Sequence, residues 1–356
     1  MIVNGGSRMA GSRMAKEEFE AKVRPFLGPF PPRPPDFDVL KASSSELMHY
    51  GLLPRPDKKN ERLFKMWLAI VTAPSPVKPR HKTLNGPFQY YLQFSQPLNS
   101  GHQETSRNWS GIAAEATGGH SFNTVYAQWQ LPKMQKPPGG KSRPFACSSW
   151  IGLDGHDPTS ASMPQIGVTM SMVWNRKKWR PYYQAWSQWW QRGQRNPVNP
   201  IAGFPAAKND IIACGLSVSS EFVVLVNIAN LTQNQAAAPF TMIAPFRPAP
   251  PIFYIYGVRG HTAVWIAERP KEMNASANNE TYFALPDFDN ITFDNCFVQS
   301  LSPLVVRGLS PSRMIRMQEV NAKQSGSQIL SRARKDVIDP NHKFLVGPGI
   351  EKAMRA

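Results

Sequence analysis

The chain has 356 residues, of which 41% are hydrophobic and 18% charged, and its formal net charge is +17. This composition is typical of a folded, β-rich protein and excludes a largely disordered one. The positive charge favours loose association with anionic polymers or surfaces, but it predicts no chemistry. The cysteines are few and scattered, and no histidine pair has HxH or HxxxH spacing. We therefore expect no disulfide framework, no metal site and no other cofactor.

The sequence contains no run of about 18 apolar residues, so we expect no membrane-spanning segment and no membrane partner. The most apolar stretch near the N-terminus, residues 66–71, is too short and too far from the start for a classical signal peptide. These observations leave the compartment open.

Residues 1–104 are predicted to form an N-terminal extension in which proline-rich segments alternate with short helices. Residues 24–36 are too rich in proline for a helix or a central strand, which predicts an extended linker, with an SH3 ligand as the alternative. Serine and asparagine caps predict helices over 43–50 and 60–71. Removal of the extension as a propeptide is one possible fate.

A β-rich domain is predicted from residue 105 to residue 347, followed by a tail at 348–356. Segments rich in Val, Ile, Thr, Tyr and Trp alternate with clusters of Gly, Pro, Asn and Asp. This alternation indicates an all-β fold, an antiparallel two-sheet β-sandwich of the concanavalin A-like or jelly-roll type. The last two strands are expected at 313–320 and 343–347, with a polar connection between them. The other strands are expected at 122–130, 147–152, 164–174, 179–190, 210–219, 222–230, 261–268 and 291–298.

A basic hairpin tip, Arg176 to Lys178, follows the strand at 164–174. Its simplest interpretation is a solvated loop, and a nucleic-acid-binding stripe is the minor alternative. We expect no nucleic-acid partner.

Residues 263–268, AVWIAE, place a carboxylate at the end of an apolar strand. Strand alternation puts Val264, Ile266 and Glu268 on one side of the sheet. An ionised carboxylate is costly to bury without partners, so Glu268 is a candidate functional residue. The alternative from the pattern alone is an exposed strand end, paired with Arg269.

Gln165 is the second unusual residue, because it lies in a strand of small and apolar residues. A side-chain amide can donate a hydrogen bond to a developing oxyanion without titrating. The alternative is a polar residue on the solvent face of a half-exposed strand.

Several other catalytic classes lack their motifs. There is no GxSxG, no Walker A and no dinucleotide glycine motif, and Cys147 has no recognisable nucleophile signature. Asp154 lies in a DG turn and, with Glu268, is the evident carboxylate pair for a glycosidase, which needs two carboxylates about 5–9.5 Å apart. No motif supports that third hypothesis.

The order of eight sequence blocks resembles the glutamic peptidases, also called eqolisins or peptidase family G1. The resemblance covers roughly residues 105–300 and extends to the closing strands up to residue 347, and the N-terminal extension resembles that of bacterial members. The blocks are NWSG (108–111), VYAQWQLP (125–132), SSWIGLDG (148–155), PQIGVT (164–169), YYQAWSQWW (182–190), NDII (209–212), AVWIAERP (263–270) and LPDFDNITFDN (285–295).

The resemblance implies an acid-acting endopeptidase whose catalytic residues are Glu268 and Gln165. Glu268 would be the general base on a bound water, and Gln165 would orient the water and donate to the oxyanion. No covalent intermediate is expected. A glutamate with an ordinary pKa of about 4.3 suits work in acid.

The resemblance also suggests substrate-binding residues, Trp150, Trp186 and, less directly, Asp154, in an aromatic cleft for a polypeptide substrate. Thr169, Gln188 and Val264 are neutral where the family commonly has acids. We expect a monomer. The alternative function is a weak or inactive relative that binds peptide or carbohydrate through the same cleft.

Overall fold

The computed structural model describes most of the chain. The described residues are 12–13, 15–75, 90–92, 103–138, 144–157, 160–175, 177–192, 194, 196–245, 254–272, 282–301, 304–320 and 327–348. The predicted tail at 348–356 therefore lies almost wholly outside them, as does Arg176 of the hairpin tip.

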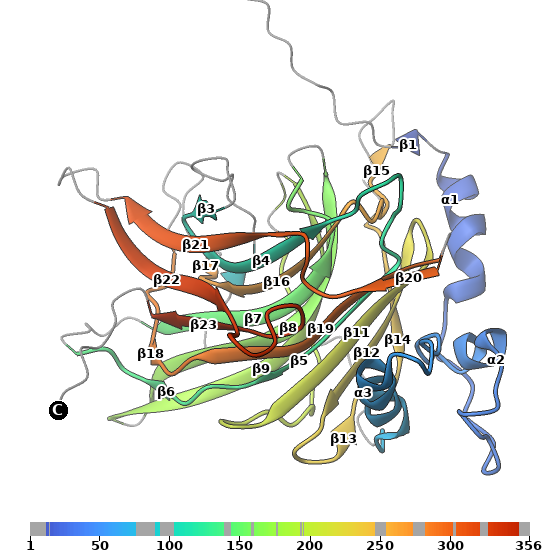
Figure 1. Ribbon diagram of the computed structural model, residues 1–356, viewed down its shortest axis with the longest axis horizontal. Coiled ribbons are helices and arrows are strands. Elements are labelled where there is room, and N and C mark those ends of the chain that lie inside the picture. Colours follow the sequence, from blue (N-terminus) through green and yellow to red (C-terminus); the bar gives the residue numbers. More distant parts are fainter. Residues whose placement is uncertain are drawn as a thin grey trace, which may run out of the picture.

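Two layers of antiparallel strands form a β-sandwich (Figure 1). The strands of the first layer, in spatial order, are β9 (Lys178–Gln191), β8 (Ser162–Asn175), β7 (Phe145–Leu153), β16 (Thr262–Glu268), β4 (Trp109–Glu115) and β21 (Ser312–Val320). Those of the second layer are β19 (Ile291–Leu301), β5 (Thr124–Gln130), β11 (Ile211–Ser220), β12 (Val223–Asn230) and β14 (Phe240–Ile243).

Strands β22 (Ser327–Lys335) and β23 (Phe344–Pro348) join the two layers along one side, because β22 pairs with β21 and β23 pairs with β19. The remaining strands are short: β1 (Ser12–Arg13), β2 (Tyr90–Tyr91), β3 (Gln103–Ser106), β6 (Met134–Gln135), β10 (Asn199–Pro200), β13 (Gln235–Ala236), β15 (Tyr254–Ile255), β17 (Lys271–Glu272), β18 (Asp287–Phe288) and β20 (Leu304–Arg307).

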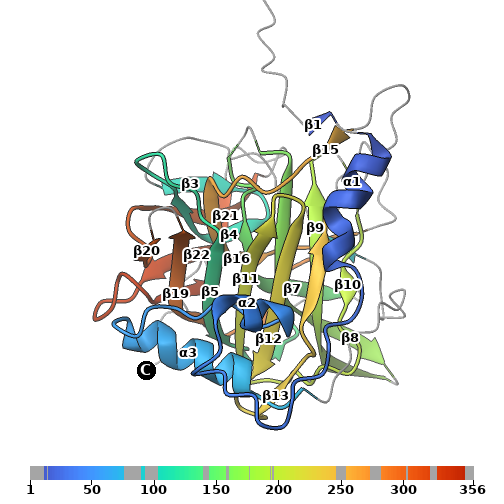
Figure 2. The ribbon, with the colours of Figure 1, turned by 90° about the vertical axis from the view of Figure 1, so that its right-hand side faces the viewer.

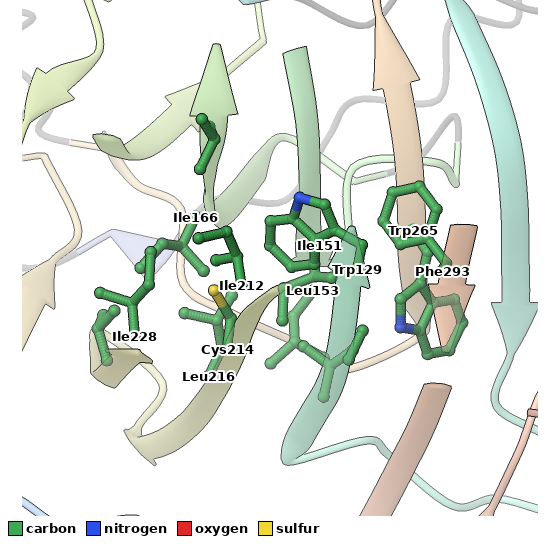
Figure 3. Close-up of a cluster of buried hydrophobic side chains, with 14 of the residues drawn as sticks. Trp129, Ile151, Leu153, Ile166, Ile212, Cys214, Leu216, Ile228, Trp265 and Phe293 are labelled. Atoms are coloured by element: carbon green, nitrogen blue, oxygen red, sulfur yellow. The ribbon is translucent and has the colours of Figure 1, made fainter. Parts of the chain in front are cut away.

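The main hydrophobic core lies between the layers (Figure 3). Each strand contributes every second residue to it, as the period of two requires. Trp265 of β16 also donates its indole N–H to the backbone carbonyl of Tyr126 on β5, at 3.0 Å, and so ties one layer to the other. The labelled core side chains are Trp129, Ile151, Leu153, Ile166, Ile212, Cys214, Leu216, Ile228, Trp265 and Phe293.

Part of the N-terminal extension covers the outer face of the second layer. Its helices are α1 (Lys16–Val23), α2 (Ser44–His49) and α3 (Glu61–Thr72), with a 3₁₀ turn at Arg24–Phe26 (Figure 2). The apolar side of α3 is buried in a cluster with Tyr126, Ala213 and Phe297 of the sheet. The domain boundary near residue 105 stays a prediction, and so does the removal of residues 1–104, but residues 37–73 share a core with the sandwich.

Most predicted elements are confirmed within one to three residues, including the helices at 43–50 and 60–71. The polar connection expected between the last two strands is wrong, because β22 occupies much of it. This strand is held by pairing with β21 on one side and β23 on the other, which its polar sequence does not indicate. The sequence also gave no expectation of α1, β3 or β4. No described helix is long and apolar enough to span a membrane.

Candidate active site

The outer face of the first layer carries tryptophans and polar side chains in alternation; we call it the tryptophan face. It is the side of that layer turned away from the core and includes Trp150, Trp186 and Trp190. Gln165, Gln188 and Glu268 have the same strand parity as these residues and lie on the same face. The two predicted catalytic residues are therefore on one face.

Glu268 is fully buried at the end of β16. Asn108 donates its side-chain N–H to Oε1, and Trp150 donates its indole N–H to Oε2, each at 3.0 Å. The alternative of an exposed strand end is wrong. Hydrogen bonds to both oxygens stabilise the ionised form of a carboxylate and offset part of the cost of its burial.

Gln165 is also fully buried, so the alternative of a solvent-facing residue is wrong too. Its Nε2 donates to Oε1 of Gln188 on the neighbouring strand at 2.5 Å. Its Oε1 accepts no hydrogen bond. An unpartnered buried amide oxygen is costly, which makes this atom a candidate contact for a water or a substrate N–H.

Trp150 lies between the two candidates in the register of the sheet. Glu268 is opposite Ser148, whereas Gln165 is opposite Gly152, so the residue between these two on the same face of β7 is Trp150. A Cβ on Gly167 would lie 2.3 Å from Cβ of Trp150, and one on Gly152 would lie 3.2 Å from its Cζ3. The glycines of the WIG and QIG blocks thus give the indole the room to lie against the sheet.

Trp186 is fully buried beside Gly167, and neither it nor Trp190 has a hydrogen-bond partner for its indole N–H. Two free indole donors at a buried face could meet the carbonyls of a bound peptide. The substrate-binding roles of Trp150 and Trp186 stay predictions.

Asp154 has a different environment. Its carboxylate accepts hydrogen bonds from the backbone N–H groups of Arg259, Gly260 and His261, at 2.6, 3.1 and 2.8 Å. Burial raises the pKa of Asp154 above its ordinary value, although these N–H groups oppose the shift. The carboxylate holds the turn that leads into β16, and direct contact of Asp154 with substrate stays a prediction.

Thr169, Gln188 and Val264, the neutral residues for which the resemblance implied acids, all lie on the tryptophan face. Thr169 shares a hydrogen bond of 2.6 Å with Ser148, Gln188 contacts Gln165, and Val264 is packed in the apolar cluster. None of these three side chains places a charge on the face.

Cys147 cannot serve as a nucleophile here. Burial, with the nearby charge of Glu268, raises the pKa of its thiol to about 12. A thiol that stays protonated is unreactive. In the part of the chain that the structure describes, no group of three or more His, Cys, Asp or Glu side chains could hold a metal.

Asn108 is the site residue that the sequence reasoning missed. It belongs to the NWSG block, but nothing in the spacing of that block indicates a contact with a residue 160 positions away. The signal available was an asparagine directly before a strand of apolar and small residues.

Comparisons with known proteins agree with the resemblance of the sequence blocks. The model of the Peptidase A4 family matches residues 107–336. No curated protein matches the chain in a sequence search.

Solved structures with similar folds include scytalido-glutamic peptidase with a transition state analog inhibitor, at 19% identity and TM-score 0.48, covering 68% of this chain and 98% of that one. A second is SCP-B, an eqolisin in complex with a tripeptide, at 19% identity and TM-score 0.46, with the same two coverages. A third is aspergilloglutamic peptidase from Aspergillus niger, at 20% identity and TM-score 0.41, covering 57% of this chain and 99% of that one.

The family match extends over nearly the whole sandwich, from just before β4 to the end of β22, and includes both predicted catalytic residues. The chain belongs to the Peptidase A4 family, the glutamic peptidases, and is an endopeptidase of that class.

Proposed function

We propose that the chain hydrolyses peptide bonds with Glu268 as general base and Gln165 as its uncharged partner. Ionised Glu268 takes a proton from a bound water, and the water oxygen attacks the scissile carbonyl carbon. A side-chain N–H of Gln165 donates to the oxyanion of the tetrahedral intermediate. Glu268 then returns the proton to the leaving nitrogen as the C–N bond breaks, so no acyl-enzyme forms.

The observation that carries this proposal is the pair of complementary environments on the tryptophan face. Both oxygens of Glu268 accept N–H donors, and such donors favour the ionised form of a buried carboxylate. Gln165 keeps an unpartnered oxygen for the water, and its amide has a second N–H beyond the one given to Gln188. Glu268 therefore removes the proton from the water, and the amide of Gln165 stabilises the negative charge that develops on the carbonyl oxygen.

Access to the face requires a movement of the residues that cover it. Leu92, Val198 and Phe283 belong to the same buried apolar cluster as Trp150 and Trp186. A polypeptide substrate has to displace some of these covering side chains, since Glu268 and Gln165 are fully buried. The tryptophans would then line the opened cleft.

The test is cleavage of casein or acid-denatured globin between about pH 2 and pH 7 by the wild-type chain, Glu268→Gln and Gln165→Ala. We expect Glu268→Gln to lower kcat by about 10²–10⁴-fold and Gln165→Ala by about 10²–10³-fold. Burst kinetics of product release would indicate a covalent intermediate and contradict the mechanism. Wild-type activity in Glu268→Gln would remove Glu268 from its role.

The alternative of a binding module has its own outcome in this experiment. Saturable peptide binding by the wild-type chain without hydrolysis at any pH would favour it. No contact in the described residues singles it out.

A further inference from the structure

Gln188 lies on β9 between Trp186 and Trp190, directly opposite Gln165 on β8. Its side chain is 1% exposed, and both ends of its amide are hydrogen-bonded. Nε2 donates to the backbone carbonyl of Asn196, and Oε1 accepts from Gln165. Gln188 thus connects the loop after β9 to the candidate catalytic amide.

The direction of this chain of hydrogen bonds is fixed by its outer end. A backbone carbonyl can only accept, so the nitrogen of Gln188 has to face Asn196 and its oxygen has to face Gln165. The nitrogen of Gln165 then has to face Gln188, which leaves Oε1 of Gln165 as the unpartnered atom. One main-chain carbonyl therefore determines the orientation of two side-chain amides.

We propose that Gln188 is a positioning residue that orients the amide of Gln165 for the reaction. This inference rests on the proposed function, because orientation matters only if Gln165 handles the water and the oxyanion. With Gln188 in place, the oxygen of Gln165 accepts from the attacking water and its second N–H remains for the oxyanion. Without Gln188 the amide could rotate by a half-turn and exchange acceptor for donor.

A carboxyl group at position 188 could replace the amide only in its protonated form. An ionised carboxylate cannot donate to the Asn196 carbonyl, and two acceptors would face each other in a buried place. A protonated carboxyl group can donate to that carbonyl and accept from Gln165, as the amide does. The amide of Gln188 keeps the arrangement at every pH.

Charged groups near this part of the face include Glu268 on β16, Lys271 on β17, and Arg192 at the end of β9. The guanidinium carbon of Arg192 lies 5.4 Å from the ring centre of Trp190. Burial lowers the pKa of Arg192 from its ordinary value, though the nearby charge of Asp157 opposes the shift. These groups, including Asp157, are common to the wild-type chain and the variants below, so a difference between the pH profiles of these proteins reports the group at position 188.

The experiment compares the full-length wild-type chain with Gln188→Leu and Gln188→Glu, using kcat and KM on one peptide substrate across acidic and neutral pH. We expect Gln188→Leu to lower kcat by about 10²-fold with KM nearly unchanged, since a small misplacement of a catalytic group has a cost of that order. Gln188→Glu should match the wild type at low pH and fall toward the Leu variant as its carboxyl group ionises. Gln130→Leu, at an exposed position of β5 in the other layer, is the control and should keep wild-type kcat.

Two results would overturn the inference. Wild-type kcat in Gln188→Leu would do so, and so would identical pH profiles of Gln188→Glu and the wild type. If Gln188→Leu fails to fold, judged by its circular dichroism, the pH comparison of Gln188→Glu still decides the question. Failure of the proposed function looks different, because Gln165→Ala would then keep full activity.

Discussion

Both outer faces of the sandwich are covered, but they differ in how far their buried polar groups are hydrogen-bonded. On the outer face of the second layer, which we call the helix face, Trp67, Asn227 and Tyr126 donate to the carbonyls of Leu53, Gly51 and Pro54. On the tryptophan face, Gln165 and two indole groups keep atoms without partners.

We interpret this difference as a division of roles, in which the helix face contributes to stability and the tryptophan face to function. The helix face is mainly apolar packing in which most polar groups are paired, with Nε of Arg55 and Oε1 of Gln299 as exceptions. The tryptophan face retains the cost of unsatisfied groups, which a fold tolerates where a ligand or a reaction will use them. Four tests can break or sharpen this comparison.

The largest effect is expected for Trp67→Ala on the helix face. Trp67 is fully buried, and truncation of a buried tryptophan costs about 3–5 kcal/mol of unfolding free energy. Urea unfolding measures the loss, while kcat of the folded protein at low temperature should stay unchanged. Trp174→Ala, at a position 55% exposed, is the control and should cost little. A large loss of kcat in folded Trp67→Ala would contradict the separation of the two faces.

Trp150→Phe tests the tryptophan face with a smaller change. It keeps an aromatic ring but removes the donor to Glu268, a charge-assisted hydrogen bond of about 1.5–3 kcal/mol. Because the donor favours ionised Glu268, its loss should lower kcat/KM and move the acid limb of the pH profile to higher pH. Trp190→Phe removes an N–H without a partner and should leave that limb in place. Equal shifts in both variants would argue against the contact.

Two asparagines give a matched pair across the faces. Asn108 donates to Glu268, whereas Asn227 donates to the carbonyl of Gly51. Each change to alanine should cost about 1–3 kcal/mol. For Asn108→Ala we expect the cost mainly in kcat/KM, and for Asn227→Ala mainly in unfolding free energy. The opposite assignment of the two losses would reverse the comparison.

The smallest effect is expected for Arg62→Met, at the rim of the helix face. Arg62 is paired with Asp294 and Asp339, but its side chain is 40% exposed, so the pairs together contribute about 1 kcal/mol or less. Burial alone would raise the pKa of Asp339, and hydrogen bonds from Arg62 and His342 outweigh it and lower the pKa.

A carboxyl group with a lowered folded-state pKa stabilises the fold above its unfolded pKa of about 3.9 and loses that contribution as pH falls through the folded value. The difference between Arg62→Met and the wild type should therefore be present at pH 7 and be lost progressively as pH falls below the unfolded pKa. Thermal unfolding at low salt measures it. A difference that persists in acid would show that packing of the Arg62 side chain, and not its charge, is responsible.

The sequence by itself determined the strands and the family. Val, Ile, Trp and Tyr recur with a period of two between turn residues, and this local pattern is sufficient for strands such as β8 and β12. The ordered blocks were sufficient for the family and for naming Glu268 and Gln165, although the pattern around each residue alone favoured an exposed position.

The tertiary structure decided what surrounds those two residues. The contact of Asn108 with Glu268 joins the bend before β4 to the end of β16, far apart in the chain, and no local pattern encodes such a pairing. The orientation of Gln165 depends on the register of β8 against β9 and on one carbonyl of the following loop. Hydrogen-bond direction is a property of assembled partners, so it could be read only once the sheet was formed.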